Sequence, residues 1–290
     1  MSQAIKSILS NLITEDHVAQ YHEEGYTLVK NVFSEKEISQ IATSFDRWKA
    51  FGELMGRTWR RQNTIIWLEN ASDISIVRGM QWPSYHDPVL AQIRLDTRLL
   101  DIIEPFIGKN VKQIINQLHW KKPNSNISWP LHRDVRSRQP VEAFTELFSS
   151  WIQTGIAIDP HREENGAMKI IPGSHKDFPA DPYNKTLYNA ESYQNDPRIK
   201  HLLMDPGDVG IWNAYTVHGG GLNTNKYLDR RFYINGYVKA ENCTRGEWAW
   251  ENGRAIPLSD QRALIQFEQV NVVKEGFYPG DRSINEKVID

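Results

Sequence analysis

Two histidines and one aspartate in this sequence are of the residue types that bind a metal ion together. His132 and Asp134 flank one arginine in the segment SWPLHRDVRS. On an extended chain, side chains two residues apart point to the same side, so this pair would present an imidazole nitrogen and a carboxylate oxygen together. A third ligand must come from a distant segment. We expect it to be His218, which follows the strand candidate GDVGIW and precedes the glycine-rich GGGLN.

A His-x-Asp step also occurs by chance, and the chain has a second one at His175 and Asp177, as well as a His-x-Glu at His161 and Glu163. His175 directly follows Pro-Gly-Ser, which favours a turn. His161 lies in the polar segment DPHREENG. We therefore expect His175 to lie in a loop or behind the ligands, and His161 to lie in a connection between strands.

The elements that must position His132, Asp134 and His218 change in character along the chain. Residues 1–107 carry mainly helical signals. Ser34 followed by Glu37 is a capping box, and Pro88 to Phe106 keeps a helical apolar stripe. Ile5 to Leu12 has the spacing of a short amphipathic helix, and GYTLVKNVF is a strand candidate.

Residues 108–240 contain short runs rich in Ile, Val, Trp and Tyr between clusters of Pro, Gly, Asn and Asp, which is typical of an antiparallel barrel or jelly roll. The strand candidates are VKQIINQLHWKK, ELFSSWIQTGIAID, AMKIIPG, GDVGIW and RRFYINGYV. In the second candidate, one face is made of small and polar residues together with a tryptophan and suits a cavity wall: Trp151, Gln153, Gly155 and Ala157.

We predict a single domain over residues 1–290, mainly β with flanking helices. It would comprise a mainly helical part (1–107), a double-stranded β-helix core of the jelly-roll, cupin-like type (108–240) and a C-terminal extension (241–290). The segment from Asp177 to His201 is expected to be a long surface loop.

Composition narrows the classes of partner. The 290 residues have a net charge of −2 and a pI near 6.5, which gives no electrostatic footprint for a nucleic acid. No apolar run approaches the length of a membrane span. Cys243 is the only cysteine, so a thiolate metal cluster is excluded and a reducing, cytoplasmic location is expected. A small-molecule substrate is the expected partner.

Several segments, in order, resemble the phytanoyl-CoA dioxygenase (PhyH)-like family of Fe(II)- and 2-oxoglutarate-dependent oxygenases. WPLHRD resembles that family's Trp-x-x-His-x-Asp signature, and VHGGGLN its distal-histidine segment. FSSWIQTGIAIDPHREENGAMKIIPGSH and QYHEEGYTLVKNVFSEKEI are similar to its central and N-terminal segments. The resemblance implies Fe(II) bound by His132, Asp134 and His218, with 2-oxoglutarate and O2 as co-substrates and succinate and CO2 as products.

The resemblance also implies a buried arginine for the distal carboxylate of 2-oxoglutarate. Arg230 is expected because it shares a strand face with Phe232 and Ile234, and Arg231 is the alternative. A side-chain amide contact is expected from Asn116, with Gln117 as the alternative. Gly220 stands where the family often has a hydroxyl residue.

Candidates for substrate contact are residues near the expected mouth or wall of the barrel: Trp120, Arg136, Trp151 and Trp212. Hydroxylation of a small or medium-sized organic molecule is the expected reaction. Two other classes remain open at this point: a non-oxidative metal enzyme of cupin type, such as an isomerase or hydrolase, and a non-catalytic jelly-roll binding module.

Overall fold

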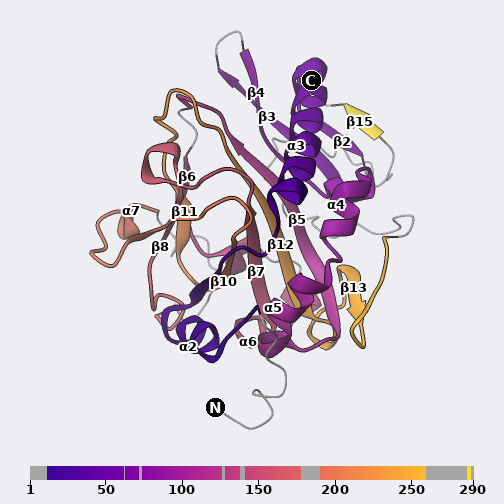
Figure 1. The fold of residues 1–290 in the computed structure, drawn as a ribbon, viewed down its shortest axis with the longest axis vertical. Coiled ribbons are helices and arrows are strands. Elements are labelled where there is room, and N and C mark those ends of the chain that lie inside the picture. Colours follow the sequence, from indigo (N-terminus) through magenta and orange to yellow (C-terminus); the bar gives the residue numbers. More distant parts are fainter. Residues whose placement is uncertain are drawn as a thin grey trace.

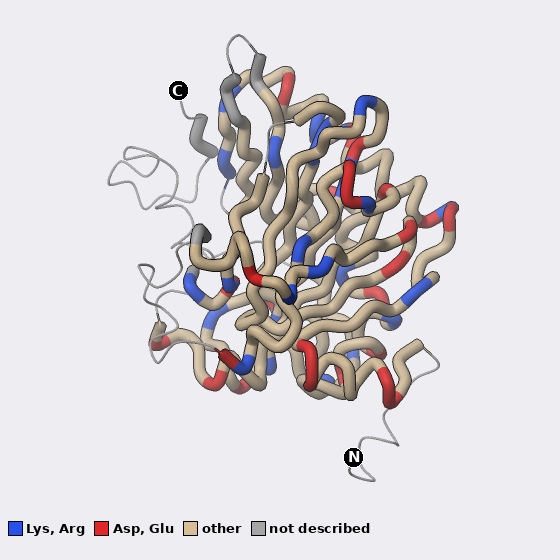
Figure 2. Tube along the Cα trace, turned by 90° about the vertical axis from the view of Figure 1, so that its left-hand side faces the viewer, with Lys and Arg blue, Asp and Glu red and all other residues tan. Residues whose placement is uncertain are grey.

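The computed structural model describes residues 12–61, 63–71, 74–125, 128–137, 141–177, 190–258 and 286–288. The amphipathic helix predicted from Ile5 to Leu12 lies almost wholly outside these residues. Within the described ranges, none of the helices combines the length and apolar character that crossing a membrane requires. In the view of Figure 2, Lys and Arg are interspersed with Asp and Glu and form no continuous basic face.

A large antiparallel sheet forms the centre of the molecule (Figure 1). Its hydrogen-bonded order is β1 (Tyr26–Val29), β10 (Val209–Asn213), β7 (Trp151–Ala157), β12 (Arg230–Lys239), β5 (Val111–Lys121), β4 (Ile74–Gln81), β3 (Thr64–Ala71), β2 (Trp59–Arg61) and β15 (Glu286–Val288). Outside this order, β13 (Glu247–Glu251) pairs with residues 111–113 of β5 and with β14 (Arg254–Ala255), so the chain after residue 240 continues the core sheet.

A smaller antiparallel sheet has the order β6 (Trp129–His132), β11 (His218–Gly220), β8 (Met168–Ile170) and β9 (Lys200–Leu202). In Figure 1 it lies on one side of the large sheet, and helices α3 and α4 lie on the other side. Two antiparallel sheets whose strands alternate along the chain are the arrangement of a jelly roll, so the predicted fold class is confirmed.

The helices are α2 (Glu15–Glu24), α3 (Glu35–Met55), α4 (Pro88–Ile93), α5 (Thr97–Ile107), α6 (Leu147–Ser150) and α7 (Ala190–Tyr193). Helices α2 to α5 pack apolar side chains such as Ile41 and Phe45 against the outer face of the large sheet, where Ile152, Ile156 and Tyr233 lie. The predicted capping box is present, since Ser34 Oγ accepts from the backbone N–H of Glu37.

The structure differs from the sequence expectations in four places. The single helix predicted from Pro88 to Phe106 is two helices, because Asp96 accepts a hydrogen bond from the backbone N–H of Arg98 and starts α5 anew. The candidate ELFSSWIQTGIAID begins as the short helix α6 rather than as a strand. Strands β2, β3 and β4 were not anticipated. The expected loop from Asp177 to His201 ends in α7 and β9, and its residues 178–189 lie outside the described part.

Candidate metal centre

His132 and His218 are direct cross-strand partners in the small sheet. His132 is the last residue of β6 and His218 the first of β11, and the register pairs the two. Their ring centroids are 4.6 Å apart. Gly219 allows the two backbones to approach, because a Cβ at this position would lie 2.6 Å from the carbonyl oxygen of Trp129. The expected convergence of the two histidines is therefore present.

Asp134 joins them from a different local structure than the sequence pattern suggested. It is the first residue of the 3₁₀ helix η2 (Asp134–Ser137), not part of an extended strand. Its Oδ1 is 3.5 Å from Nε2 of His132, and its Oδ2 is 3.4 Å from Nε2 of His218. One ligand atom from each of the three residues lies within 4.8 Å of the others. The turn brings the carboxylate between the rings as effectively as strand alternation would.

Backbone carbonyls fix the orientation of both imidazoles. Nδ1 of His132 is 2.7 Å from the carbonyl oxygen of Pro130, and Nδ1 of His218 is 2.9 Å from that of Thr216. A ring that donates from Nδ1 keeps the lone pair on Nε2, which here points toward Asp134. The geometry therefore leaves one nitrogen of each ring available to a metal ion.

Burial and charge set the protonation state that a metal requires. Burial lowers the pKa of His218 to about 4 although the charge of Asp134 opposes it. Burial alone would raise the pKa of Asp134, but the charge of His218 and the hydrogen bond and charge of His132 lower it. A hydrogen bond from Gln153 adds to this effect. At neutral pH the set therefore offers a neutral imidazole at His218 and an ionised carboxylate at Asp134.

The second oxygen of Asp134 is held by two donors from the large sheet. Nε2 of Gln153 donates to Oδ2 at 2.8 Å, and Nε1 of Trp212 donates to the same oxygen at 3.3 Å. Sequence reasoning placed Gln153 on a cavity-facing side of its strand but did not assign it to the site. Trp212, a candidate substrate residue, also lies with its ring centroid 5.5 Å from that of His218.

The two adjacent arginines of β12 have different environments. Arg231 forms a two-point ion pair with Asp159, at 2.7 and 3.0 Å, and a further one with Asp46 at 3.0 Å. Arg230 is 3% exposed, and its Nε has no hydrogen-bond partner among the described residues. Burial lowers the pKa of Arg230 to about 10. A buried guanidinium that lies 5.8 Å from the Phe232 ring centroid and keeps an Nε–H without an acceptor among these residues fits a missing anion, whereas Arg231 is already paired.

Asn116 and Gln117 occupy opposite faces of β5. Asn116 Nδ2 donates to Tyr233 Oη at 2.7 Å and to Asn235 Oδ1 at 2.8 Å, on the face that the helices cover. Gln117 lies on the inner face, which Arg230 shares, and its Oε1 is 3.1 Å from Nε2 of His119. The geometry therefore reverses the expected order and favours the alternative, Gln117.

The remaining substrate candidates separate in the same way. Trp120 packs edge-on against Phe45 under the helices, with 5.1 Å between ring centroids, so it does not line the inner face. Trp151 lies on the inner face, on the same side of β7 as Gln153. Arg136, in η2, is near enough for its charge to help lower the pKa of His218. Of the four candidates, only Trp120 is placed away from the site.

An aromatic contact beside the site escaped sequence reasoning. His119, on the inner face of β5, stacks on Trp129 with 4.7 Å between centroids and an 11° angle between planes. The guanidinium carbon of Arg78 lies 4.8 Å from the centre of the Trp129 ring. The only sequence signal for this contact is strand alternation: His119 is two residues from Gln117 and two from Lys121, so the three side chains share one face of β5.

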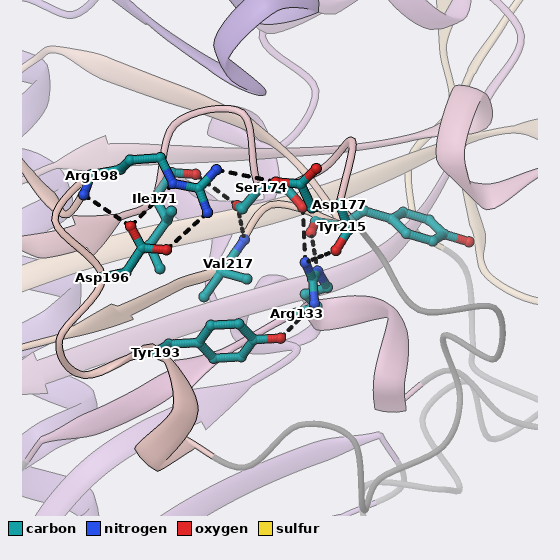
Figure 3. A network of polar contacts seen from close by, with 9 residues as sticks. All are labelled: Arg133, Ile171, Ser174, Asp177, Tyr193, Asp196, Arg198, Tyr215 and Val217. Carbon is teal, nitrogen blue, oxygen red and sulfur yellow. Dashed lines mark hydrogen bonds and ion pairs between the residues drawn. The ribbon is translucent and has the colours of Figure 1, made fainter.

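Arg133, between the two candidate ligands, anchors the chain behind them (Figure 3). It is 2% exposed and donates to the carbonyl oxygens of Tyr215, Ser174 and Asp177 at 2.7–2.9 Å and to Tyr193 Oη at 2.6 Å. Arg198 continues this network with ion pairs to Asp177 and Asp196. The backbone that carries His132 and Asp134 is thus tied to distant segments through one buried guanidinium.

The two other histidines considered from the sequence lie elsewhere. His175 Nε2 is 3.1 Å from the carbonyl oxygen of His22, and His161 Nε2 is 3.3 Å from that of Arg231. Within the described part of the chain, neither belongs to the group of residues that could hold a metal.

The family model of phytanoyl-CoA dioxygenase (PhyH) matches residues 21–232. The chain belongs to this family. Proteins of similar sequence include a probable alpha-ketoglutarate-dependent hypophosphite dioxygenase from Stutzerimonas stutzeri, which is 26% identical over 77% of each chain. The peroxisomal phytanoyl-CoA dioxygenase of Homo sapiens is 24% identical over 81% of this chain and 68% of its own. The ectoine dioxygenase of Bordetella bronchiseptica is 21% identical over 75% and 73%.

Several solved structures share the fold of this PhyH-family chain. EctD from S. alaskensis, solved with 2-oxoglutarate and 5-hydroxyectoine, superposes with a TM-score of 0.65 at 18% identity, covering 86% of this chain and 90% of its own. The alpha-ketoglutarate-dependent carbocyclase SnoK superposes with a TM-score of 0.64 at 18% identity, covering 86% and 94%.

Proposed function

We propose that this PhyH-family protein is an Fe(II)- and 2-oxoglutarate-dependent dioxygenase that hydroxylates a small or medium-sized organic molecule. The observation that carries the proposal is the convergence of His132, Asp134 and His218, whose ligand atoms lie within 4.8 Å of one another. Two neutral imidazoles and one carboxylate are the donor set of non-haem Fe(II) oxygenases, and such a set leaves coordination positions open for co-substrates. These three residues would hold the iron.

The inner face of the large sheet supports a site for 2-oxoglutarate. Arg230 is a buried cation that forms no ion pair among the described residues, and a carboxylate would supply the missing partner. Gln117 lies on the same face and would give an amide contact. When bound, iron and 2-oxoglutarate supply the oxidising chemistry: one oxygen atom of O2 goes to the substrate, the other to succinate, and CO2 is released.

The chain's own residues would position the substrate and limit water near the metal. Trp212 and Trp151 give a buried aromatic wall on the inner face, and Arg136 adds a positive charge near His218. The named relatives act on chemically unrelated molecules, so the substrate is proposed only as a class. Because Cys243 is the only cysteine, we propose a cytoplasmic location.

The rival classes explain less of the site. A cupin-type isomerase or hydrolase would use the same three metal ligands, but it would not need the buried, unpaired Arg230. A binding module would need neither the ligand set nor the two carbonyls that orient the imidazoles.

Anaerobic titration tests the proposal. Addition of Fe(II) and 2-oxoglutarate should give a weak visible charge-transfer band, which His132→Ala and Asp134→Ala should each abolish. His201→Ala, in β9 and outside the candidate centre, should keep the band. An intact, folded protein that gives no band would favour the non-oxidative reading. A screen of candidate substrates for succinate formation would then identify the substrate class.

A further inference from the structure

Two basic side chains face each other on the inner surface of the large sheet. Lys121 on β5 and Arg230 on β12 are direct cross-strand partners, 0% and 3% exposed. Like charges placed opposite each other repel, and burial increases the cost because water no longer screens them. Within the described ranges, neither side chain forms an ion pair with a carboxylate. This pair therefore requires an explanation beyond folding.

The ammonium of Lys121 occupies space that a side chain at position 220 would otherwise use. A Cβ on Gly220 would lie 2.7 Å from Nζ of Lys121 and 3.5 Å from Nη2 of Arg230. Both nitrogens thus approach one point. Charge-assisted hydrogen bonds of about 2.8 Å would let the two oxygens of a single carboxylate reach both of them.

Lys121 also retains a donor for such a carboxylate. Its Nζ donates to the carbonyl oxygens of Gly166, at 3.3 Å, and Gly221. An ammonium has three N–H groups, so one remains. Burial and then the charge of Arg230 lower the pKa of Lys121 to about 5, and a bound anion would restore the ammonium form.

We infer that Lys121 is a second cationic anchor for the distal carboxylate of 2-oxoglutarate, beside Arg230, and that Gly220 gives it the necessary room. The inference rests on the proposed function. It assigns a role to a buried lysine that neither the metal centre nor the sheet explains. It also accounts for a glycine where the family often has a hydroxyl residue, because the lysine takes the place of that hydroxyl.

Binding of two keto acids to one variant tests the role of Lys121. Lys121→Met removes the charge and ends one atom earlier. Kd is measured by calorimetry on the Mn(II)-loaded full chain, for 2-oxoglutarate and for pyruvate, which lacks the distal carboxylate. We expect Kd for 2-oxoglutarate to rise at least about tenfold, since a charge-assisted bond is worth about 1.5–3 kcal/mol, and Kd for pyruvate to stay within about twofold. Lys112→Met, at the other end of β5, is the matched control and should change neither.

The glycine gives a second, independent test. Gly220→Ser in the wild-type background should weaken 2-oxoglutarate binding, because its side chain would collide with the Lys121 ammonium. In the Lys121→Met background the same substitution should strengthen binding, because the serine hydroxyl then supplies a donor. This reversal of sign would not arise if Lys121 only linked the two glycine carbonyls.

Other outcomes would overturn the inference. They are an unchanged Kd for 2-oxoglutarate in Lys121→Met, or equal losses for 2-oxoglutarate and pyruvate. If Lys121→Met does not fold, Gly220→Ala decides, since it leaves the lysine in place and should still weaken 2-oxoglutarate selectively. A wild-type protein that binds pyruvate and 2-oxoglutarate equally well would refute both anchors. A wild-type protein that binds neither would refute the proposed function itself.

Discussion

Gln153 in the large sheet holds Asp134, which lies two residues after the end of β6 in the small sheet: Nε2 of Gln153 donates a 2.8 Å hydrogen bond to Oδ2 of the carboxylate. The amide thereby fixes the orientation of a carboxylate whose Oδ1 lies 3.5 Å from Nε2 of His132 and whose Oδ2 lies 3.4 Å from Nε2 of His218. Residues of this kind, behind the metal ligands, tune metal affinity because they orient the ligand and stabilise its charge.

Substitution of Gln153 should therefore weaken metal binding. In Gln153→Glu, a second carboxylate would face Asp134 and replace attraction with repulsion. We expect Fe(II) affinity to fall about 10- to 100-fold, measured by anaerobic metal titration. Gln92→Glu makes the same chemical change on the exposed surface of α4 and should have no effect. Equal affinities in the two variants would mean that Gln153 does not support the centre.

Substitutions of the two neighbouring arginines of β12 should cause different defects, one in 2-oxoglutarate binding and the other in stability. Arg230→Ala should weaken 2-oxoglutarate binding strongly, because the buried guanidinium is the expected partner of its carboxylate. Arg231→Ala should lower thermal stability instead, because it leaves the 14% exposed Asp159 side chain without its two-point partner. Calorimetric binding and thermal denaturation of both variants separate the two roles. The reverse order of binding defects would show that the strand faces were assigned wrongly.

Alternation along β12 was sufficient to predict the face of the strand on which Arg230 lies. Phe232 and Ile234 place Arg230 on the inner face, and the structure pairs Arg231 with acidic residues on the other side. The same rule did not select Gln117 over Asn116. β5 contains a register shift between Gln113 and Ile115, so residues counted from the N-terminal end of the strand change face there.

Other features depend on contacts that no local pattern contains. Strands β2 to β4 lie between residues 59 and 81, where charged and polar residues such as Arg60 and Asn63 interrupt the apolar alternation. Both of these side chains are buried in the fold, which the sequence gives no reason to expect. The contact of Gln153 with Asp134 likewise depends on the 3₁₀ turn after β6 and on the packing of two sheets.

The Arg133 network should contribute substantially to stability. Arg133→Met would leave the carbonyl oxygens of Tyr215, Ser174 and Asp177 without this donor, and we expect the free energy of unfolding to fall by about 3 kcal/mol or more. Arg198→Met removes a guanidinium of the same network whose side chain is 47% exposed. It should cost at most about 1 kcal/mol, because exposed ion pairs contribute little. Urea denaturation of the metal-free proteins measures both, and equal losses would contradict the assigned importance of burial.

Buried neutral histidines should make the metal-free protein sensitive to acid. Burial, followed by the charges of Arg230 and Lys121, lowers the pKa of His119 to about 3, and burial lowers the pKa of His218 to about 4. Both values lie below the pKa of about 6.5 for an unfolded histidine. Below that pH the unfolded chain binds protons that the folded chain does not. Stability should therefore fall as the pH drops from about 6.5, by up to about 1.4 kcal/mol per pH unit for each such histidine.

His119→Gln isolates one of these contributions. The difference in the free energy of unfolding between pH 7 and pH 5 should shrink by about 2 kcal/mol relative to the wild type, because one proton uptake by the unfolded chain is removed. His22→Gln is the control, since the side chain of His22 is exposed in the folded protein. Urea denaturation with a chelator at both pH values measures the difference. If the difference in the free energy of unfolding between pH 7 and pH 5 is as large in His119→Gln as in the wild type, His119 takes up its proton in the folded state. The inner face would then be less shielded from water than its burial indicates.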